Sequence, residues 1–218
     1  MSHYLHCILV EVESCLPKNA SISDYTQERL EALLRAEAMN ATALYQGEVF
    51  DGRTEESAGR WRDEFPGRGV VMGCKEPERF LKLLEEYSRL PLEKALEAIR
   101  LARGTEWSWR TMEQVRAGGY VVSPDPANGT DGLYWSARPA GPLTVDEDFI
   151  KKVWDGRIPG YPVAYNLKKA LDLADGQYRT DSCFFSVPDE DAKASAETLD
   201  AARKNPQAYA LVFCDYYR

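Results

Sequence analysis

Histidine is the scarcest reactive residue in this chain, with only two among 218 residues. Both of them, His3 and His6, lie at the start of the sequence, so any catalysis by an imidazole has these two candidates alone. The sequence also lacks a phosphate-binding glycine loop, a dinucleotide fingerprint, a nucleophile elbow and a zinc-ligand pattern. These absences argue against histidine-dependent catalysis and against the enzyme classes that carry such motifs.

Long apolar runs are absent as well, and none approaches the roughly 20 residues that a membrane-spanning helix needs. The first residues, MSHYLHC, lack the charged and apolar regions of a secretory signal. We therefore expect a cytoplasmic protein that makes no contact with a membrane.

Cysteine is sparse, with five residues and no pair at the C-x-x-C spacing. An odd number of cysteines in a cytoplasmic chain indicates reduced thiols, most of them buried. His3, His6 and Cys7 come nearest to a metal-ligand cluster, but on a strand His6 and Cys7 point to opposite faces and cannot share one ion. The sequence therefore predicts no metal site and no cofactor.

Basic residues are outnumbered by acidic ones, 27 to 35, which gives a net charge of −8 and a pI near 5.0. A protein that coats nucleic acid needs a basic surface to neutralise phosphates. Here lysine and arginine are interleaved with the acids along the whole chain, which also argues against mimicry of DNA by an acidic surface. Nucleic acid is therefore not expected as a partner.

Two apolar runs near the C-terminus, residues 182–187 and 209–217, flank a segment of helix length. This pattern predicts a strand, a helix and a strand. Pro188 and the acids that follow it are typical of a first helical turn, and Asn205 with Pro206 predicts the end of the helix.

The N-terminal residues 4–13 form the first predicted strand, which is apolar on both faces in its middle, as expected for a central strand. An amphipathic helix follows, with Leu30, Leu34 and Ala38 on its buried side and Arg35 on its outer side. Further strands are predicted at residues 69–72 and 183–187, and helices after Pro77 and Pro91.

These elements predict an α+β fold, with a mixed α/β fold as the alternative. The sheet would have about five strands in a ferredoxin-like arrangement built from both chain ends. Residues 1–76 and 161–218 would form the core that contains the sheet. Residues 77–160 would form a helical and loop-rich insertion or second lobe, and a single compact domain is the alternative.

Aromatic and charged residues gather around a long loop that is rich in proline, glycine, asparagine and aspartate. Flat rings beside a guanidinium can bind a planar or phosphorylated small molecule, a peptide or a sugar. The alternative is that the rings fill a seam between the sheet and the middle of the chain. The predicted site residues are Trp107, Trp109, Arg110, Asp125, Asp131, Tyr134, Trp135 and Arg138.

Together these observations favour a non-catalytic binding or accessory protein over an enzyme. Its partner would be a small molecule or a protein, and a homodimer stays open. The alternative is a small-molecule enzyme whose carboxylate, tyrosine or cysteine chemistry has no sequence motif. A pocket that holds convergent polar groups would distinguish the two.

Overall fold

A computed structural model describes residues 2–104, 122–123, 134–135, 147–158, 162–175 and 183–218 of the chain. The chain divides into two compact units. The first unit comprises Met1–Leu90 and Ser182–Arg218, and the second comprises Pro91–Asp181. No helix in the described ranges is both long enough and apolar enough to cross a membrane.

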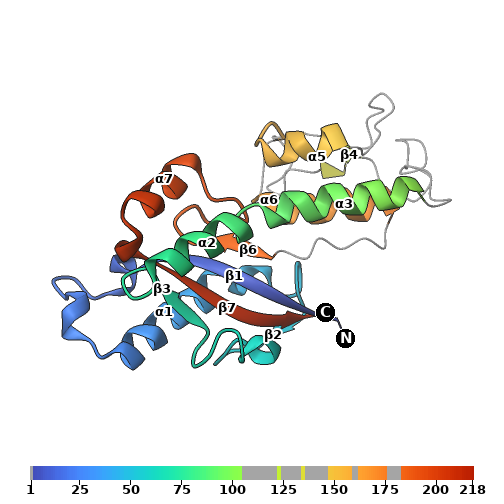
Figure 1. Cartoon of the computed structure of the whole chain (residues 1–218). Helices are drawn as coiled ribbons and strands as arrows, with labels where there is room; N and C mark the ends of the chain where they lie inside the picture. Colours follow the sequence, from blue (N-terminus) through green and yellow to red (C-terminus); the bar gives the residue numbers. More distant parts are fainter. Residues whose placement is uncertain (1, 105–121, 124–133, 136–146, 159–161, 176–182) are drawn as a thin grey trace. The chain divides into compact units, whose positions relative to one another are not determined.

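The first unit is built on a five-stranded sheet (Figure 1). Its strands are β1 (His3–Glu11), β2 (Gly52–Arg53), β3 (Val70–Met72), β6 (Phe184–Ser186) and β7 (Tyr209–Tyr217). The strand order is β2-β7-β1-β6, and β3 also pairs with β7. The α+β class and the predicted sheet of five strands from both chain ends are therefore confirmed.

The longest pairing in this sheet joins the two ends of the chain. Strands β1 and β7 are antiparallel from His3 opposite Tyr217 to Glu11 opposite Tyr209. On its other side β1 pairs in parallel with β6, with Cys7 opposite Phe184. The central strands β7, β1 and β6 thus have the ferredoxin-like order and directions, whereas β2 and β3 are added beside β7.

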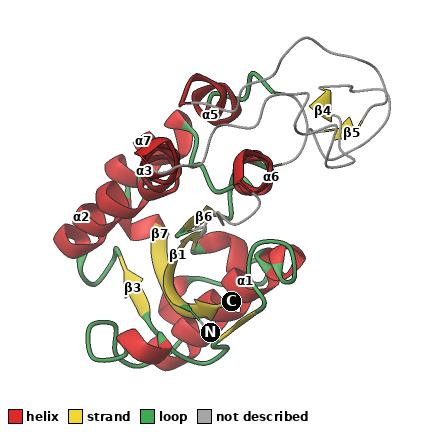
Figure 2. Cartoon of the chain, turned by 90° about the vertical axis from the view of Figure 1, so that its right-hand side faces the viewer, coloured by secondary structure: helices red, strands yellow, loops and turns green. Residues whose placement is uncertain are grey.

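Strand β1 is buried on both faces, as its sequence predicts. Ile8 and Val10 belong to one apolar cluster and Cys7 and Leu9 to another, because successive side chains point to opposite sides of a strand. Figure 2 shows helices α1 (Gln27–Ala41) and α2 (Pro77–Tyr87) on opposite sides of the sheet. His6 and Cys7 consequently face different layers of the protein.

Helix α1 covers the first face. The Thr26 side chain accepts a hydrogen bond from the backbone N–H of Arg29 and begins the helix. Leu30, Leu34 and Ala38 are buried against the sheet, as predicted. The prediction that Arg35 lies on the outer side is wrong, since only 2% of this residue is exposed.

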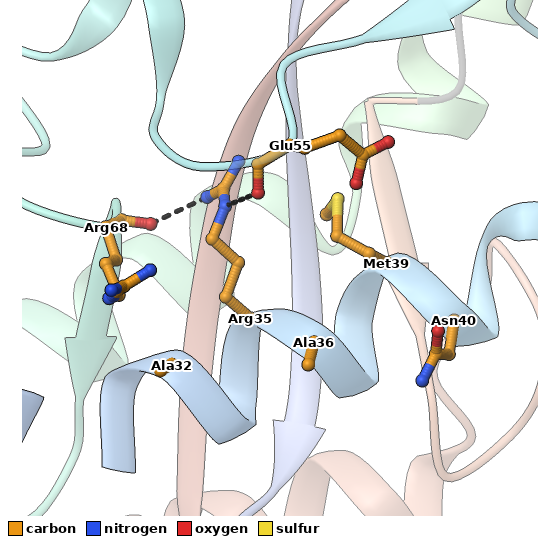
Figure 3. Close-up of a pocket in the computed structure, with 7 residues that line it drawn as sticks. All are labelled: Ala32, Arg35, Ala36, Met39, Asn40, Glu55 and Arg68. Carbon is orange, nitrogen blue, oxygen red and sulfur yellow. Dashed lines mark hydrogen bonds between the residues drawn. The ribbon is translucent and has the colours of Figure 1, made fainter. Parts of the chain in front are cut away.

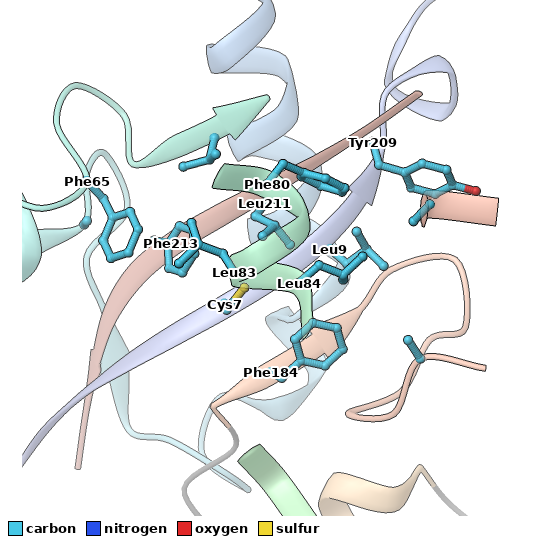
Figure 4. Close-up of a cluster of buried hydrophobic side chains, with 14 residues drawn as sticks. Cys7, Leu9, Phe65, Phe80, Leu83, Leu84, Phe184, Tyr209, Leu211 and Phe213 are labelled. Atoms are coloured by element: carbon cyan, nitrogen blue, oxygen red, sulfur yellow. The ribbon is translucent and has the colours of Figure 1, made fainter. Parts of the chain in front are cut away.

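Helices α2 and α7 (Ala196–Lys204) cover the second face, where the larger apolar cluster lies (Figure 4). Phe80 and Leu84 of α2 are almost completely buried in it. The rings of Phe65 and Phe213 stack with their centroids 3.7 Å apart and an interplanar angle of 9°. Burial of such large rings on both faces makes the sheet the rigid centre of this unit.

Helix α7 starts later than the sequence predicts. Pro188 and the acids after it form a turn, in which the Ser186 hydroxyl donates to the Asp189 carboxylate at 2.5 Å. The helix begins only after Ser195, whose Oγ accepts from the backbone N–H of Thr198. Its predicted end is confirmed, because Asn205 is the C-cap.

The remaining helices and strands are α3 (Leu90–Gly104), α5 (Glu147–Trp154), α6 (Val163–Asp175), β4 (Val122–Ser123) and β5 (Tyr134–Trp135). Helices α5 and α6 contact each other, and Phe149, Ile150 and Val153 of α5 are buried. Strands β4 and β5 form a short antiparallel pair. Short 3-10 helices lie at Glu13–Cys15, Ile22–Asp24, Ala43–Tyr45, Gly59–Trp61 and Pro206–Ala208.

Candidate functional site

A groove of about 320 Å³ runs along helix α1 in the first unit, and we call it the α1 groove (Figure 3). The helix supplies one wall, and the segment around Glu55 and Arg68 supplies the other. The lining residues are Ala32, Arg35, Ala36, Met39, Asn40, Glu55 and Arg68. The groove therefore combines an apolar floor with charged groups of both signs.

Arg35 connects the two walls of this groove, because it belongs to α1 and its guanidinium bonds the segments that contain Glu55 and Arg68. Its guanidinium donates all of its five N–H groups to backbone carbonyl oxygens at 2.6 to 2.9 Å. The acceptors are the carbonyls of Thr54, Glu55, Ser57, Arg68 and Phe213. Burial lowers the pKa of the Arg35 guanidinium, but a group with an ordinary pKa this high stays charged.

Because Arg35 has no donor left over, other side chains must contact any ligand. Figure 3 shows the Arg68 side chain toward the Ala32 end of the groove and the Glu55 carboxylate toward Met39. Asn40 lies beyond Met39 on the exposed side of α1. An arginine, a carboxylate and an amide thus surround a floor of small and apolar side chains.

A second arginine fixes the Glu55 end of the groove. The Arg53 guanidinium donates to the Met39 carbonyl at 2.6 Å and to the Thr42 hydroxyl. Its Nε also donates to the Glu55 carboxylate at 3.3 Å. Arg35 and Arg53 therefore tie the wall around Glu55 to helix α1 through hydrogen bonds to protein groups.

The two ends of the chain bring together another polar pair, His3 and Asp215. The His3 Nδ1 lies 2.8 Å from Oδ1 of Asp215, and the two side chains are 19% and 4% exposed. The second carboxylate oxygen accepts from the backbone N–H of Arg60 at 3.2 Å. A nearly buried carboxylate thus orients an imidazole that solvent can still reach.

The backbone at Gly59 approaches the Asp215 side chain closely, and the geometry of the His3–Asp215 pair depends on this approach. Gly59 has φ +56°, and a Cβ at this position would lie 2.6 Å from Oδ2 of Asp215 and 2.8 Å from Oγ1 of Thr54. Glycine adopts this left-handed conformation without strain, and only glycine leaves that space empty. The segment before Arg60 can therefore approach Asp215 closely enough to donate its N–H.

His6 has a different environment from His3. Burial, and to a smaller extent the charge of Arg53, lower the pKa of His6 to about 3, although a weak contact with the Phe184 backbone partly opposes the shift. Neither ring nitrogen has a hydrogen-bond partner of good geometry within the described ranges. The rings of Phe50 and Tyr216 lie edge-on to it, at 6.1 and 5.2 Å. His6 is therefore a neutral core residue at physiological pH.

Most of the site that the sequence predicts lies outside the described residues. This holds for Trp107, Trp109, Arg110, Asp125, Asp131 and Arg138. Tyr134 and Trp135 form β5, opposite Ser123 and Val122 of β4. The aromatic site therefore stays a prediction.

Sequence reasoning missed both arrangements in the first unit. His3 and Asp215 are 212 positions apart, and only the register of β1 and β7 brings them together. Arg35 did carry a signal in the sequence, because it lies three positions before Ala38, which belongs to the predicted apolar side of the helix. That spacing places Arg35 at the edge of the buried side of α1.

Within the described ranges, no three histidine, cysteine, aspartate or glutamate residues lie close enough together to hold a metal ion. The five cysteines are free thiols, and Cys7, Cys183 and Cys214 are buried, as predicted. Burial raises the pKa of the Cys214 thiol to about 12, so this thiol stays protonated and unreactive.

The chain matches no protein-family model, no curated protein and no solved structure. Only the local geometry and charge of its own residues therefore bear on function. The α1 groove and the pair of His3 and Asp215 each present polar groups that a nearly buried, hydrogen-bonded side chain holds in place.

Proposed function

We propose that this protein is a cytoplasmic binding or accessory protein that recognises a small molecule or a protein partner through an arginine-lined surface, and that this surface binds its ligand without catalysis. The α1 groove supports this proposal, because five hydrogen bonds from Arg35 hold its walls in place before any ligand arrives. A preformed site loses little conformational entropy when it binds. This preformed, charged groove is the observation that carries the proposal.

The groups at the rim indicate the chemistry of the ligand. Arg68 suits a carboxylate or a phosphate, because a guanidinium donates two parallel hydrogen bonds to such groups. Glu55 and Asn40 suit an amine or a hydroxyl at the other end of the groove. A volume of about 320 Å³ fits a small metabolite. The ligand we expect is a small polar molecule with an anionic group.

A thermal-shift screen with small carboxylates and phosphates tests this function. A ligand at one hundred times its Kd stabilises the native state by about 2.7 kcal/mol, which raises the melting temperature measurably. If no compound in such a panel raises the melting temperature at millimolar concentration, the proposed groove function is wrong.

The Arg68→Ala variant then locates the site. This change removes the guanidinium but keeps the Arg68 carbonyl that accepts from Arg35. We expect the affinity for a hit from the screen to fall by about tenfold or more, with the melting temperature within a few degrees of wild type. Arg89→Ala, at an exposed site outside the groove, is the matched control. Equal affinity in Arg68→Ala and wild type would place the ligand elsewhere.

The aromatic segment is the second surface that we propose for recognition. If this surface binds the small molecule or protein partner, Trp109→Ala and Trp135→Ala should each lower the affinity for that ligand or partner by about tenfold or more. The melting temperature of each variant should stay within a few degrees of wild type. Rings that only fill a core would instead lose about 3 to 5 kcal/mol of stability when truncated. Calorimetric titration and thermal melting of each variant distinguish the two roles.

A further inference from the structure

The pair of His3 and Asp215 shares no residue with the α1 groove and carries a different chemistry. Asp215 accepts the proton on Nδ1 of His3, so the lone pair of the neutral ring lies on Nε2. Within the described part of the chain Nδ1 is the only atom of the His3 side chain with a hydrogen bond. Nε2 is therefore free to accept a proton from a bound molecule.

The imidazole is fixed in this orientation from two sides. The backbone N–H of Arg60 holds Oδ2 of Asp215, so the carboxylate cannot turn away from His3. The Tyr217 ring lies beside the imidazole, with ring centroids 5.5 Å apart and an interplanar angle of 43°. Burying the Asp215 carboxylate costs free energy, and one exposed hydrogen bond would not offset that cost. Asp215 instead has two partners, the His3 ring and the Arg60 N–H. The arrangement resembles the oriented imidazole of a general base.

We propose that His3 is a general base that hydrolyses small aryl esters, with Asp215 as the residue that positions it. Water is the nucleophile, because no serine, threonine or cysteine in the described ranges bonds to His3. The partly exposed Tyr217 ring gives the aryl group an apolar surface beside the base. This activity belongs to a site separate from the α1 groove, and it departs from the expectation, drawn from the scarcity of histidine, that the protein does not use imidazole catalysis.

The reaction follows from the position of Nε2. Nε2 takes a proton from water while the water oxygen forms a bond to the ester carbonyl carbon. The tetrahedral adduct then breaks its bond to the aryloxy oxygen, and the imidazolium returns the proton to that oxygen. The products are a carboxylic acid and a phenol, and the enzyme is regenerated without any other reactant.

Hydrolysis of p-nitrophenyl acetate by the full chain tests the proposal. We expect saturable hydrolysis, and we expect His3→Gln to lower kcat/KM by about a hundredfold, at the low end of the usual range for a general base. The control is His6→Phe, which removes the other histidine of the chain and should leave kcat/KM within about twofold. Equal rates for wild type and His3→Gln would overturn the proposal.

Asp215→Asn tests the positioning role. The amide oxygen can accept from the Arg60 N–H while the NH₂ group donates to Nδ1, which moves the ring proton to Nε2 and blocks the base. We expect kcat to fall by about tenfold or more while KM stays within about twofold. A change in melting temperature with kcat unchanged would show that Asp215 only holds the strands together.

Chemical modification provides a second measurement that does not depend on the ester chosen. Diethyl pyrocarbonate acylates neutral, accessible imidazole nitrogens, and this chain has only His3 and His6. We expect one rapidly modified histidine in the native wild-type protein and none in His3→Gln, with the ester activity lost in step with modification. Modification of His3 without loss of activity would overturn the proposal, even if Asp215→Asn fails to fold.

Discussion

At the scale of single residues, Arg35 shows how one side chain can organise a whole segment. The loop that contains Thr54, Glu55 and Ser57 has no strand or helix to use its carbonyl groups, and Arg35 bonds all three. Buried carbonyls without partners are costly, so the guanidinium takes the place of a ladder of backbone bonds. A charged residue is buried here because every one of its donors finds an acceptor.

Arg35→Leu should therefore destabilise the protein by about 3 to 5 kcal/mol, because several buried carbonyls lose their donors at once. Arg35→Lys should fall between this variant and wild type, since an ammonium has three donors and no planar fork. Urea denaturation of both variants checks this order, with the exposed Arg62→Lys as control. Stability of Arg35→Leu within about 0.5 kcal/mol of wild type would contradict this role.

A second prediction for a single residue concerns His6 and the dependence of the protein's stability on pH. Its pKa is about 3 in the folded protein and 6.5 in the unfolded chain, so the unfolded state binds the proton more readily. The contribution to stability is complete above pH 6.5 and falls toward pH 3, by up to about 1.4 kcal/mol per pH unit. From pH 6.5 to pH 5, wild type should thus lose about 1.6 kcal/mol more than His6→Phe.

Urea denaturation at a series of pH values measures this difference. The Arg62→Lys variant, at an exposed site, keeps both histidines and serves as the control, so its difference in stability from wild type should not change over this pH range. Parallel stability curves for wild type and His6→Phe between pH 6.5 and pH 5 would show that His6 is not the titrating group.

At the scale of elements, β7 is the strand on which the rest of the sheet depends. It pairs with β1, β2 and β3, and every residue from Tyr209 to Tyr216 is buried. Apart from β7, strand β1 pairs only with the three residues of β6. Loss of β7 would therefore expose both apolar layers and leave β2 and β3 without a partner strand.

Removing residues 210–218 should abolish soluble expression, because the core loses its most connected strand. Removing Arg218 alone is the matched control, since this residue follows the end of β7. Solubility in expression trials and a cooperative thermal transition are the measurements. A soluble, cooperatively melting protein without residues 210–218 would contradict the central role of β7.

At the scale of the whole molecule, the two units differ in how much of the core they hold. The two large apolar clusters on the faces of the sheet consist entirely of residues from Met1–Leu90 and Ser182–Arg218. The first unit thus contains a complete core of its own. Such a unit can fold independently of the segment inserted into it.

Replacing Pro91–Asp181 by a flexible glycine and serine linker of about 20 residues, which reaches about 25 Å on average, should leave a folded protein. The matched deletion of residues 77–160 removes α2, with Phe80 and Leu84, and should give no cooperative transition. The two deletions also decide between this boundary and the one that the sequence predicts at residues 77 and 160. Aggregation of the first variant would show that the inserted segment is needed for folding.

The sequence by itself determined where most elements of the first unit lie and, apart from Arg35, which side of β1 and α1 is buried. The alternation of apolar residues in β1, the spacing of Leu30, Leu34 and Ala38, and Pro77 at the start of α2 are local signals, because they depend on the geometry of one strand or helix. The order Asn205, Pro206 likewise predicted the end of α7 from short-range sterics.

Only the tertiary structure decided which distant residues meet. His3 and Asp215 form a pair because β1 and β7 run antiparallel in one particular register, and a shift by one residue would move Asp215 to the other face. Arg35 is buried because carbonyls from three separate segments converge on it, and no local pattern reports that convergence. Local patterning encodes which side of an element is apolar, whereas the partners of a polar side chain depend on how the elements assemble.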